Sequence, residues 1–316
     1  MSSIASGKQG QTPNVVVVDA ATVVPVRIDP TLSGTAREKV VLNFKDYNLT
    51  EEAQTQLKDF NWEFKSKLQV LLGQSEVVNW VRSESPEALS LMRYGGEWKL
   101  PGGSKDHGET MEQTAIRELS EEFDVAVPKE AILRPFRVNS TRVIQGKSYR
   151  MWNFVCLADE NEWLNNIDVA ALNRRLFRKR NDFFEKYAKS GSPFWKMNKH
   201  DREKVSPEVY QVSWMNLSDI IDTYLNSKHA PGALVPTNSF QAEEFAKHNV
   251  ESRDPMYATM TTIRALEDAG SFDAIRKIST STFNKEASRL AKKEAATQQW
   301  DAGANTRMTT RLDQKL

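Results

Sequence analysis

Three glutamates near position 120 have the spacing of a metal site. Glu118, Glu121 and Glu122 lie at positions i, i+3 and i+4, so a helix would project all three carboxylates from one face within about one turn. At ~4 Å and an effective dielectric of ~20, each repulsion is on the order of 4 kcal/mol. Divalent cations that prefer oxygen ligands, Mg²⁺ or Mn²⁺, would offset this repulsion. The alternative is an exposed acidic helix on a solvated surface.

The residues around the glutamates predict a helix with two different faces. Thr110 and Gln113 form a capping-box pattern, so we expect the helix to begin near Thr110. An apolar stripe next to the carboxylates predicts the face that packs on a core; it consists of Ala115, Ile116, Leu119 and Phe123. Residues 98–103 read as a strand end that runs into a glycine turn, where the backbone can approach a metal or a phosphate.

The segment from Gly103 to Val125 resembles the Nudix box, whose pattern is G-x5-E-x7-R-E-U-x-E-E-x-G-U with U an aliphatic residue. All the charged positions match, namely Glu109, Arg117, Glu118, Glu121 and Glu122, and so do Gly103, Leu119 and Val125. One position differs, because Asp124 stands where the family usually has glycine. Asp adopts the left-handed conformation of a helix end better than most residues do, so we expect the turn to be kept.

The resemblance implies a cofactor and a set of ligands. In Nudix proteins the three glutamates, here Glu118, Glu121 and Glu122, bind one to three divalent cations, which implies Mg²⁺ or Mn²⁺. The backbone carbonyl at the position of Gly103 often adds a ligand. The early glutamate, here Glu109, commonly pairs with the arginine, here Arg117, and fixes the loop against the helix.

The resemblance also implies hydrolysis of a nucleoside diphosphate that is linked to another group. Bound cations neutralise the diphosphate and lower the pKa of a water molecule, and a carboxylate then takes the proton. That base lies within the box in some members and on a distant loop or strand in others. Our candidate outside the box is Glu208, just before a strand-like segment at 209–214; the alternative is a surface residue entering a strand. His107 in the box loop is a candidate phosphate contact or a solvated loop histidine.

The remaining pattern predicts the fold class. Strands are expected at 76–82, 88–93, 132–138, 149–157 and 209–214, and a short helix at 217–225. This order fits the α/β/α sandwich around a mixed sheet that the Nudix resemblance implies. The resemblance covers about residues 75–226, and we expect this range to form the Nudix domain.

Extensions are expected on both sides of that domain. Residues 1–74 should form an N-terminal extension, with valine-rich strands at 14–18 and 22–28 and a helix from Thr50 through Leu72 that ends at Gly73. Residues 227–316 should form a helical C-terminal extension with a mobile tail after Trp300. Its helices are expected after Asp254 and Pro255, at 272–278 and at 282–298. Whether the extensions pack on the domain or bind protein partners stays open.

A basic insertion at about 159–206 separates two strands of the expected domain. Between residues 171 and 204 there are eleven Lys and Arg against four Asp and Glu, a net charge of +7 in a chain whose total is +1. Such asymmetry favours a polyanionic ligand, such as an RNA 5′ end or an inositol polyphosphate, with Arg178, Lys179 and Arg180 as candidate contacts. The alternative is an amphipathic helix with a basic outer face. Phe194 and Trp195 can stack on bases or belong to the core.

Composition sets the outer limits. With 39% hydrophobic and 27% charged residues, the chain is typical of globular proteins rather than disordered ones. The sequence has no apolar run long enough for a membrane span and no apolar signal core in its first residues. The single cysteine, Cys156, excludes an internal disulfide. These features favour an intracellular, cytoplasmic location.

The sequence therefore predicts a Mg²⁺- or Mn²⁺-dependent Nudix hydrolase that cleaves a pyrophosphate linkage. Three substrate classes stay open: a nucleotide sugar or dinucleotide, a capped or triphosphorylated RNA end, and a diphosphoinositol polyphosphate. The basic insertion shifts the balance slightly toward a larger polyanion. The alternative is a Nudix-fold subunit of a larger RNA-binding complex that acts mainly as a scaffold, against which the intact glutamates argue.

Overall fold

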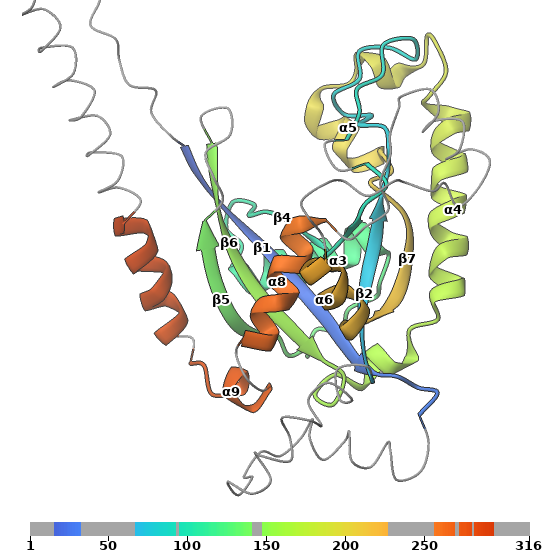
Figure 1. Ribbon diagram of the computed structural model, residues 1–316. Helices are drawn as coiled ribbons and strands as arrows, with labels where there is room; N and C mark the ends of the chain where they lie inside the picture. Colours follow the sequence, from blue (N-terminus) through green and yellow to red (C-terminus); the bar gives the residue numbers. More distant parts are fainter. Residues whose placement is uncertain are drawn as a thin grey trace, which may run out of the picture.

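A seven-stranded mixed sheet lies at the centre of the molecule (Figure 1). The computed structural model describes residues 16–32, 67–92, 95–140, 147–226, 256–268, 272–279 and 281–293. The main path of the sheet has the order β3-β2-β1-β6-β5, with β4 paired to β1 and β7 paired to β2. The strands are β1 (Val16–Ile28), β2 (Leu68–Ser75), β3 (Trp98–Lys99), β4 (Gly102–Ser104), β5 (Arg134–Ser140), β6 (Lys147–Leu157) and β7 (Val209–Asn216).

Helices cover both faces of this sheet. One apolar cluster packs α6 (Leu217–Asn226), α8 (Tyr257–Asp268) and α9 (Phe272–Arg276) against one face. A second cluster packs α3 (Met111–Phe123), η1 (Glu162–Asn166) and α4 (Val169–Lys186) against the other, together with Phe283 and Ala287 from the helical residues 281–293. In Figure 1, α6 and α8 lie in front of β1 while α3 lies behind the sheet. The predicted α/β/α sandwich with a mixed sheet is confirmed.

The strand β1 belongs to both clusters because it is buried on both faces. Val24 and Val26 pack into the first cluster and Val23 into the second, and all three are fully buried. This strand pairs in parallel with β6 from Val16↔Lys147 to Val26↔Leu157. The two valine-rich strands expected at 14–18 and 22–28 therefore form one strand, apart from residues 14 and 15, which lie outside the described residues.

The prediction of a helix through Leu72 is wrong over its last turns. Residues 68–75 form β2, which pairs with β1, β3 and β7. The residues Leu68, Val70, Leu71 and Leu72 are all fully buried. A strand buried on both faces carries a continuous apolar run, and its spacing cannot be distinguished from a helical stripe. Residues 50–66 of the expected helix lie outside the described residues.

The prediction of two strands at 76–82 and 88–93 is also wrong. The described part of this segment forms turns, joined by isolated antiparallel bridges at Val78↔Leu91 and Ser85↔Ala88. Val77, Val78 and Trp80 are buried, so their apolar pattern reflects packing and not a regular ladder. The segment is a folded-back loop between β2 and β3. Residue 93 lies outside the described residues.

The expected domain boundary at residues 74 and 75 falls at the end of β2, inside the sheet. The strands β1 and β2 contribute core residues shared with β6 and β7, and so do α8 and α9. Among the described helices, none has the length and hydropathy needed to cross a membrane. The expected cap at Asp254 and Pro255 and the tail after Trp300 lie outside the described residues.

The smaller helices complete the insertion between β6 and β7. After α4 the chain continues through η2 (Pro193–Lys196) to α5 (Lys199–Val205). Leu172, Leu176 and Phe183 form the buried face of α4, which confirms an amphipathic helix. Phe194 is fully buried beside Phe183 and Trp80, so it is a core residue and not a stacking platform.

The packing of α8 predicts that this helix stabilises the sheet. Ile263 is fully buried in the cluster that also holds α6, so the Ile263→Ala variant should lower the free energy of unfolding by about 2–5 kcal/mol. Urea unfolding measures the change, with Thr262→Ala on the same helix as the matched control. A loss below about 1 kcal/mol would show that α8 does not belong to this core.

Candidate active site

The helix α3 has the ends that the sequence predicts. The Thr110 side chain accepts a hydrogen bond from the Gln113 backbone N–H, and the Gln113 side chain accepts one from the Thr110 N–H. At the other end Asp124 adopts the left-handed conformation, with φ 56° and ψ 34°. The apolar face of α3 is buried through Met111, Ala115, Leu119 and Phe123. The opposite face is thereby held at a fixed orientation.

The glycine turn before α3 lies directly against that face. The strand β4 pairs with β1, with Gly102 opposite Thr22 and Gly103 opposite Ala21. A Cβ atom on Gly102 would lie 2.5 Å from the Ala21 carbonyl oxygen, and one on Gly103 would lie 2.4 Å from Oε1 of Glu118. Gly102 has no room for a side chain, and at Gly103 a side chain would have to displace the Glu118 carboxylate, which lies against the backbone there.

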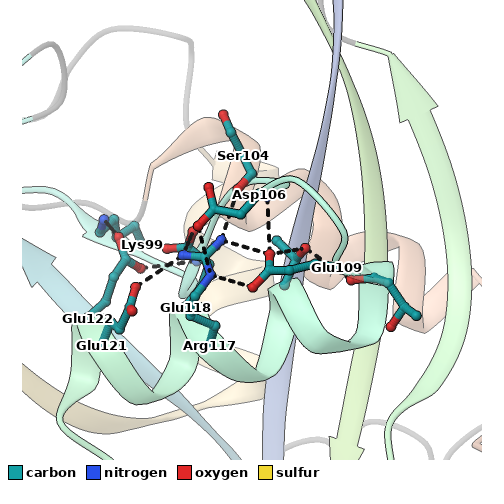
Figure 2. Close-up of polar contacts among 11 residues, drawn as sticks. Lys99, Ser104, Asp106, Glu109, Arg117, Glu118, Glu121 and Glu122 are labelled. Carbon is teal, nitrogen blue, oxygen red and sulfur yellow. Dashed lines mark hydrogen bonds and ion pairs between the residues drawn. The ribbon is translucent and has the colours of Figure 1, made fainter. Parts of the chain in front are cut away.

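Arg117 is the centre of a charged network that joins the turn to the helix (Figure 2). Its Nε donates to Glu109 at 2.8 Å. Its Nη1 donates to Glu118 at 2.8 Å and to Glu121 at 3.0 Å, and its Nη2 donates to the Ser104 carbonyl at 3.0 Å. The pairing expected between Glu109 and Arg117 is present in the structure.

This network shifts the protonation of its members. The hydrogen bond from Arg117 is the main cause that lowers the pKa of Glu109 to about 2, helped by the Asp106 N–H and the Thr114 hydroxyl. Burial lowers the pKa of Arg117, but hydrogen bonds and charges from the glutamates more than offset it, so that its pKa lies above the usual value. For Glu118, burial raises the pKa and Arg117 partly reverses the rise.

A second charged group surrounds Glu122. This carboxylate is buried and accepts hydrogen bonds from the Lys99 ammonium and from the Gly102 N–H, the latter at 3.0 Å. Burial raises the pKa of Glu122. Burial lowers the pKa of Lys99, but the charges of Glu122 and Glu208 outweigh it and leave that pKa above its usual value.

Glu208 joins this group from the start of β7. It shares a hydrogen bond with Glu122, and burial together with the Glu122 charge raises the pKa of Glu208 to about 7. Its backbone carbonyl accepts a hydrogen bond from the Glu76 N–H at 2.9 Å, which fixes the chain there. The structure thus brings the one candidate outside the box to the box carboxylates.

The three box glutamates point in two directions. The side chains of Glu118 and Glu122 are 12% and 5% exposed, and both face the glycine turn, whereas Glu121 is 62% exposed. Within the described residues no three or more His, Cys, Asp or Glu side chains are already arranged as metal ligands. The cations that meet the carboxylates here are Arg117 and Lys99.

The donor set nevertheless fits a hard divalent cation. Carboxylate oxygens of Glu118 and Glu122 converge on a glycine turn that presents backbone instead of side chains, and oxygen is the ligand atom that Mg²⁺ and Mn²⁺ prefer. A side-chain rotation of exposed Glu121 would add a third carboxylate. Lys99 was missed by sequence reasoning, because one lysine at a strand end carries no signal of its own.

The candidate contacts in the basic insertion have different positions. Arg178 and Lys179 are exposed, as is His107 in the box loop. Arg180 is only 4% exposed; its guanidinium pairs with Glu76 at 2.9 Å and lies 3.7 Å from the Tyr210 ring centre. Arg180 is thus part of a buried pair instead of an exposed cation, and its contact with a polyanion stays a prediction.

Asp124 links the box helix to the insertion. Its carboxylate accepts from Arg175 and Lys179 of α4. Burial raises the pKa of Asp124, but these two cations outweigh it and the pKa lies below its usual value. The replacement of the usual glycine thus keeps the left-handed turn and adds two ion pairs between α3 and α4.

Comparison with known proteins identifies the family of this chain. A family model described as the NUDIX domain matches residues 73–234. The chain belongs to the Nudix family. A putative 8-oxo-dGTP diphosphatase 3 of Mycobacterium tuberculosis is 37% identical over 76 residues, which make up 24% of this chain and 29% of that protein. The matched stretch is thus under a third of this relative's length.

Solved Nudix structures resemble the chain at lower identity. A NUDIX hydrolase from Alicyclobacillus acidocaldarius is 11% identical over 84% of this chain and 98% of its own, with a TM-score of 0.38. The NUDIX domain of Shewanella oneidensis NrtR, complexed with ADP ribose, is 14% identical over 74% of this chain and 88% of its own, with a TM-score of 0.31. Nudix hydrolases generally use divalent metals, which agrees with the oxygen donors described above.

The low pKa of Glu109 predicts a dependence of stability on pH. Because the folded pKa of about 2 lies below the ordinary 4.5, ionised Glu109 stabilises the fold above pH 4.5, and this contribution is lost as the pH falls toward 2. The unfolding free energy of Glu109→Gln should lie below that of the unmodified protein at neutral pH, and the gap should narrow toward about pH 3. A gap that stays constant over this range would contradict the assigned ion pair.

Proposed function

We propose that this Nudix protein hydrolyses a pyrophosphate linkage in a nucleoside diphosphate-linked compound, with Mg²⁺ or Mn²⁺ as cofactor. The observation that carries the proposal is that Glu118 and Glu122 lie against the turn at Gly102 and Gly103, while Glu208 lies beside Glu122. Neighbouring carboxylates that are buried or half-buried are costly to the fold unless cations meet them. An acidic surface helix would not bury them.

Specific groups would hold the cation. Glu118, Glu121, Glu122 and the Gly103 carbonyl supply hard oxygen donors of the kind that Mg²⁺ and Mn²⁺ take. When bound, the cation supplies charge neutralisation for the diphosphate and lowers the pKa of a water molecule. Arg117 keeps the turn against α3 through its bonds to Ser104 and Glu109. It therefore fixes the two elements that carry the donors.

Glu208 and Lys99 complete the proposed chemistry. Glu208 lies next to Glu122 but belongs to another element, so it can accept a proton from water without being needed as a metal ligand. The charges of Glu122 and Glu208 both act on the Lys99 ammonium. When a bound cation neutralises Glu122, this ammonium can bind a phosphate oxygen instead. We therefore assign Glu208 as the proton acceptor and Lys99 as a phosphate contact.

Among the three substrate classes, a nucleotide has the most support. Of the basic side chains proposed to hold a large polyanion, Arg180 is buried against Glu76, and Lys179 is tied to Asp124. The segment's net charge therefore overstates the charge that is available to an RNA or an inositol polyphosphate. The M. tuberculosis relative is named for a nucleotide substrate, which agrees with a nucleotide here.

Carboxylate-to-amide substitutions test this function. Glu122→Gln should lower turnover of a nucleoside diphosphate-linked substrate at least about a hundredfold, since it removes a direct metal ligand. Glu208→Gln should lower turnover by about 10²–10⁴-fold because it removes the proton acceptor. Initial rates with Mg²⁺ or Mn²⁺ measure both effects, over a panel that includes ADP-ribose, dinucleoside polyphosphates and capped RNA.

The matched control is Glu112→Gln, a glutamate of the first turn of the same helix that we place outside the site. Its turnover should equal that of the unmodified protein, and circular dichroism should show all three variants folded. If Glu122→Gln and Glu208→Gln are folded and fully active, the assigned roles are wrong. If the unmodified protein turns over no compound of the panel while binding Mn²⁺, a scaffold function replaces hydrolysis.

A further inference from the structure

The helix α4 of the insertion is attached to both elements that carry the proposed site. One is α3, which holds the box glutamates, and the other is β7, which begins directly after Glu208. In Figure 1, α4 runs alongside β7. The buried stripe of α4 consists of Leu172, Leu176 and Phe183. Because successive helix residues are about 100° apart, polar side chains of α4 flank this stripe on both sides.

One flank of α4 holds the end of α3. The Nε of Arg175 donates to the Asp124 carboxylate at 2.5 Å, and its Nη2 donates to the Asp124 backbone carbonyl at 2.8 Å. Lys179, one turn further along α4, donates to the same carboxylate. Asp124 ends the helix two residues after Glu122. Residues 120–123, the last turn of α3, include no lysine or arginine, so α4 supplies the cations that stabilise a helix C-terminus.

The other flank of α4 holds β7 and the backbone at Glu208. The side chain of Asn173 donates to the Val212 carbonyl at 3.0 Å and accepts from the Val212 N–H at 2.8 Å. Two turns later, the buried guanidinium of Arg180 pairs with Glu76 at 2.9 Å. The Glu76 N–H in turn donates to the Glu208 carbonyl at 2.9 Å. The same helix is therefore attached to β7 and to the residue that is bonded to the Glu208 backbone.

These attachments matter because Glu122 and Glu208 belong to different parts of the chain. Their carboxylates share a hydrogen bond, and they repel each other when both are ionised. Their separation therefore depends on how firmly α3 and β7 are held. The attachment points on α4 are fixed by its own backbone hydrogen bonds; those at Asn173 and Arg180 lie roughly 10 Å apart along the helix. Such precision affects a reaction, since a displacement of about 1 Å can cost about a hundredfold in rate.

We propose that α4 sets the separation of Glu122 and Glu208, with Asp124 and Arg175 as positioning residues of the site. The inference rests on the proposed function, in which Glu122 holds the cation and Glu208 takes a proton from water. Asp124 has neither role and acts through the end of α3. The glycine that is usual at this position of the Nudix box has no side chain for these ion pairs. This attachment therefore comes from the combination of Asp124 with the insertion.

Two substitutions loosen the attachment without touching a reacting group. Asp124→Asn keeps a residue that tolerates the left-handed turn but removes the charge, and Arg175→Gln removes one of its partners. Each should lower kcat about tenfold and change KM less than about twofold, since the reacting groups are displaced and the binding contacts are kept. Arg175→Lys keeps an ion pair with Asp124 and should recover most of kcat. Initial rates on the substrate panel measure these values, and circular dichroism checks that the variants fold.

A double substitution separates positioning from a general loss of structure. If Asp124 acts through Glu208, then Asp124→Asn should lower kcat less than about twofold in a protein that already carries Glu208→Gln. A full tenfold loss in that background would overturn the inference. Crystals of Asp124→Asn give a readout that needs no activity. The Glu122 and Glu208 carboxylates should lie farther apart there by about 0.5 Å or more, and an unchanged contact would also overturn the inference.

The matched control is Arg174→Gln, next to Arg175 on the same helix. Arg174 is 63% exposed, and its guanidinium lies 3.9 Å from the Asp168 carboxylate at the start of α4. This control should keep the kcat of the unmodified protein and the contact between Glu122 and Glu208. Full activity in both Asp124→Asn and Arg175→Gln would refute the positioning role. Separated carboxylates in the Asp124→Asn crystals, together with an unmodified protein that cleaves no compound of the panel, would contradict the proposed function alone.

Discussion

The guanidinium of Arg117 is the interaction on which the site depends. It reaches Glu109, Glu118 and Glu121 and also the Ser104 carbonyl, so one side chain joins the glycine turn to the helix and offsets part of the acidic charge. Without it, the carboxylates of one helical turn would repel each other with little compensation. Lys99 has the same role for Glu122. The cationic side chains of Arg117 and Lys99 thus neutralise carboxylates that Nudix proteins generally use to bind divalent metals.

The sheet and the insertion position this network from opposite sides. The buried strand β1 pairs with β4 and so fixes the glycine turn, while β7 brings Glu208 to Glu122. On the far side, Asp124 ties the end of α3 to α4, and α4 in turn carries Arg180, whose pairing with Glu76 supports the start of the folded-back loop after β2. The basic insertion therefore has a structural role that its net charge does not reveal.

Features that depend on neighbouring residues could be predicted from the sequence, whereas features that depend on distant residues could not. The capping box, the left-handed Asp124 and the amphipathic α4 depend on residues close in the chain; the first two were predicted, and the third was the alternative to a polyanion site. The two-sided burial of β2 was not, since Leu68–Ser75 is buried only because β1, β3 and β7 surround it. Likewise Lys99 and the buried Arg180 acquire their roles from partners 23 and 104 residues away. Glu208 was named as a candidate from the sequence, but only the fold places it beside Glu122.

The proposed function requires these carboxylates to gather a divalent cation at the glycine turn. Anomalous diffraction from crystals soaked in Mn²⁺ tests it most directly. We expect an anomalous peak coordinated by Glu118 and Glu122 together with the Gly103 carbonyl, with Lys99 withdrawn from Glu122. A saturating soak that leaves no peak there, with Arg117 and Lys99 still paired to the same carboxylates, would contradict it.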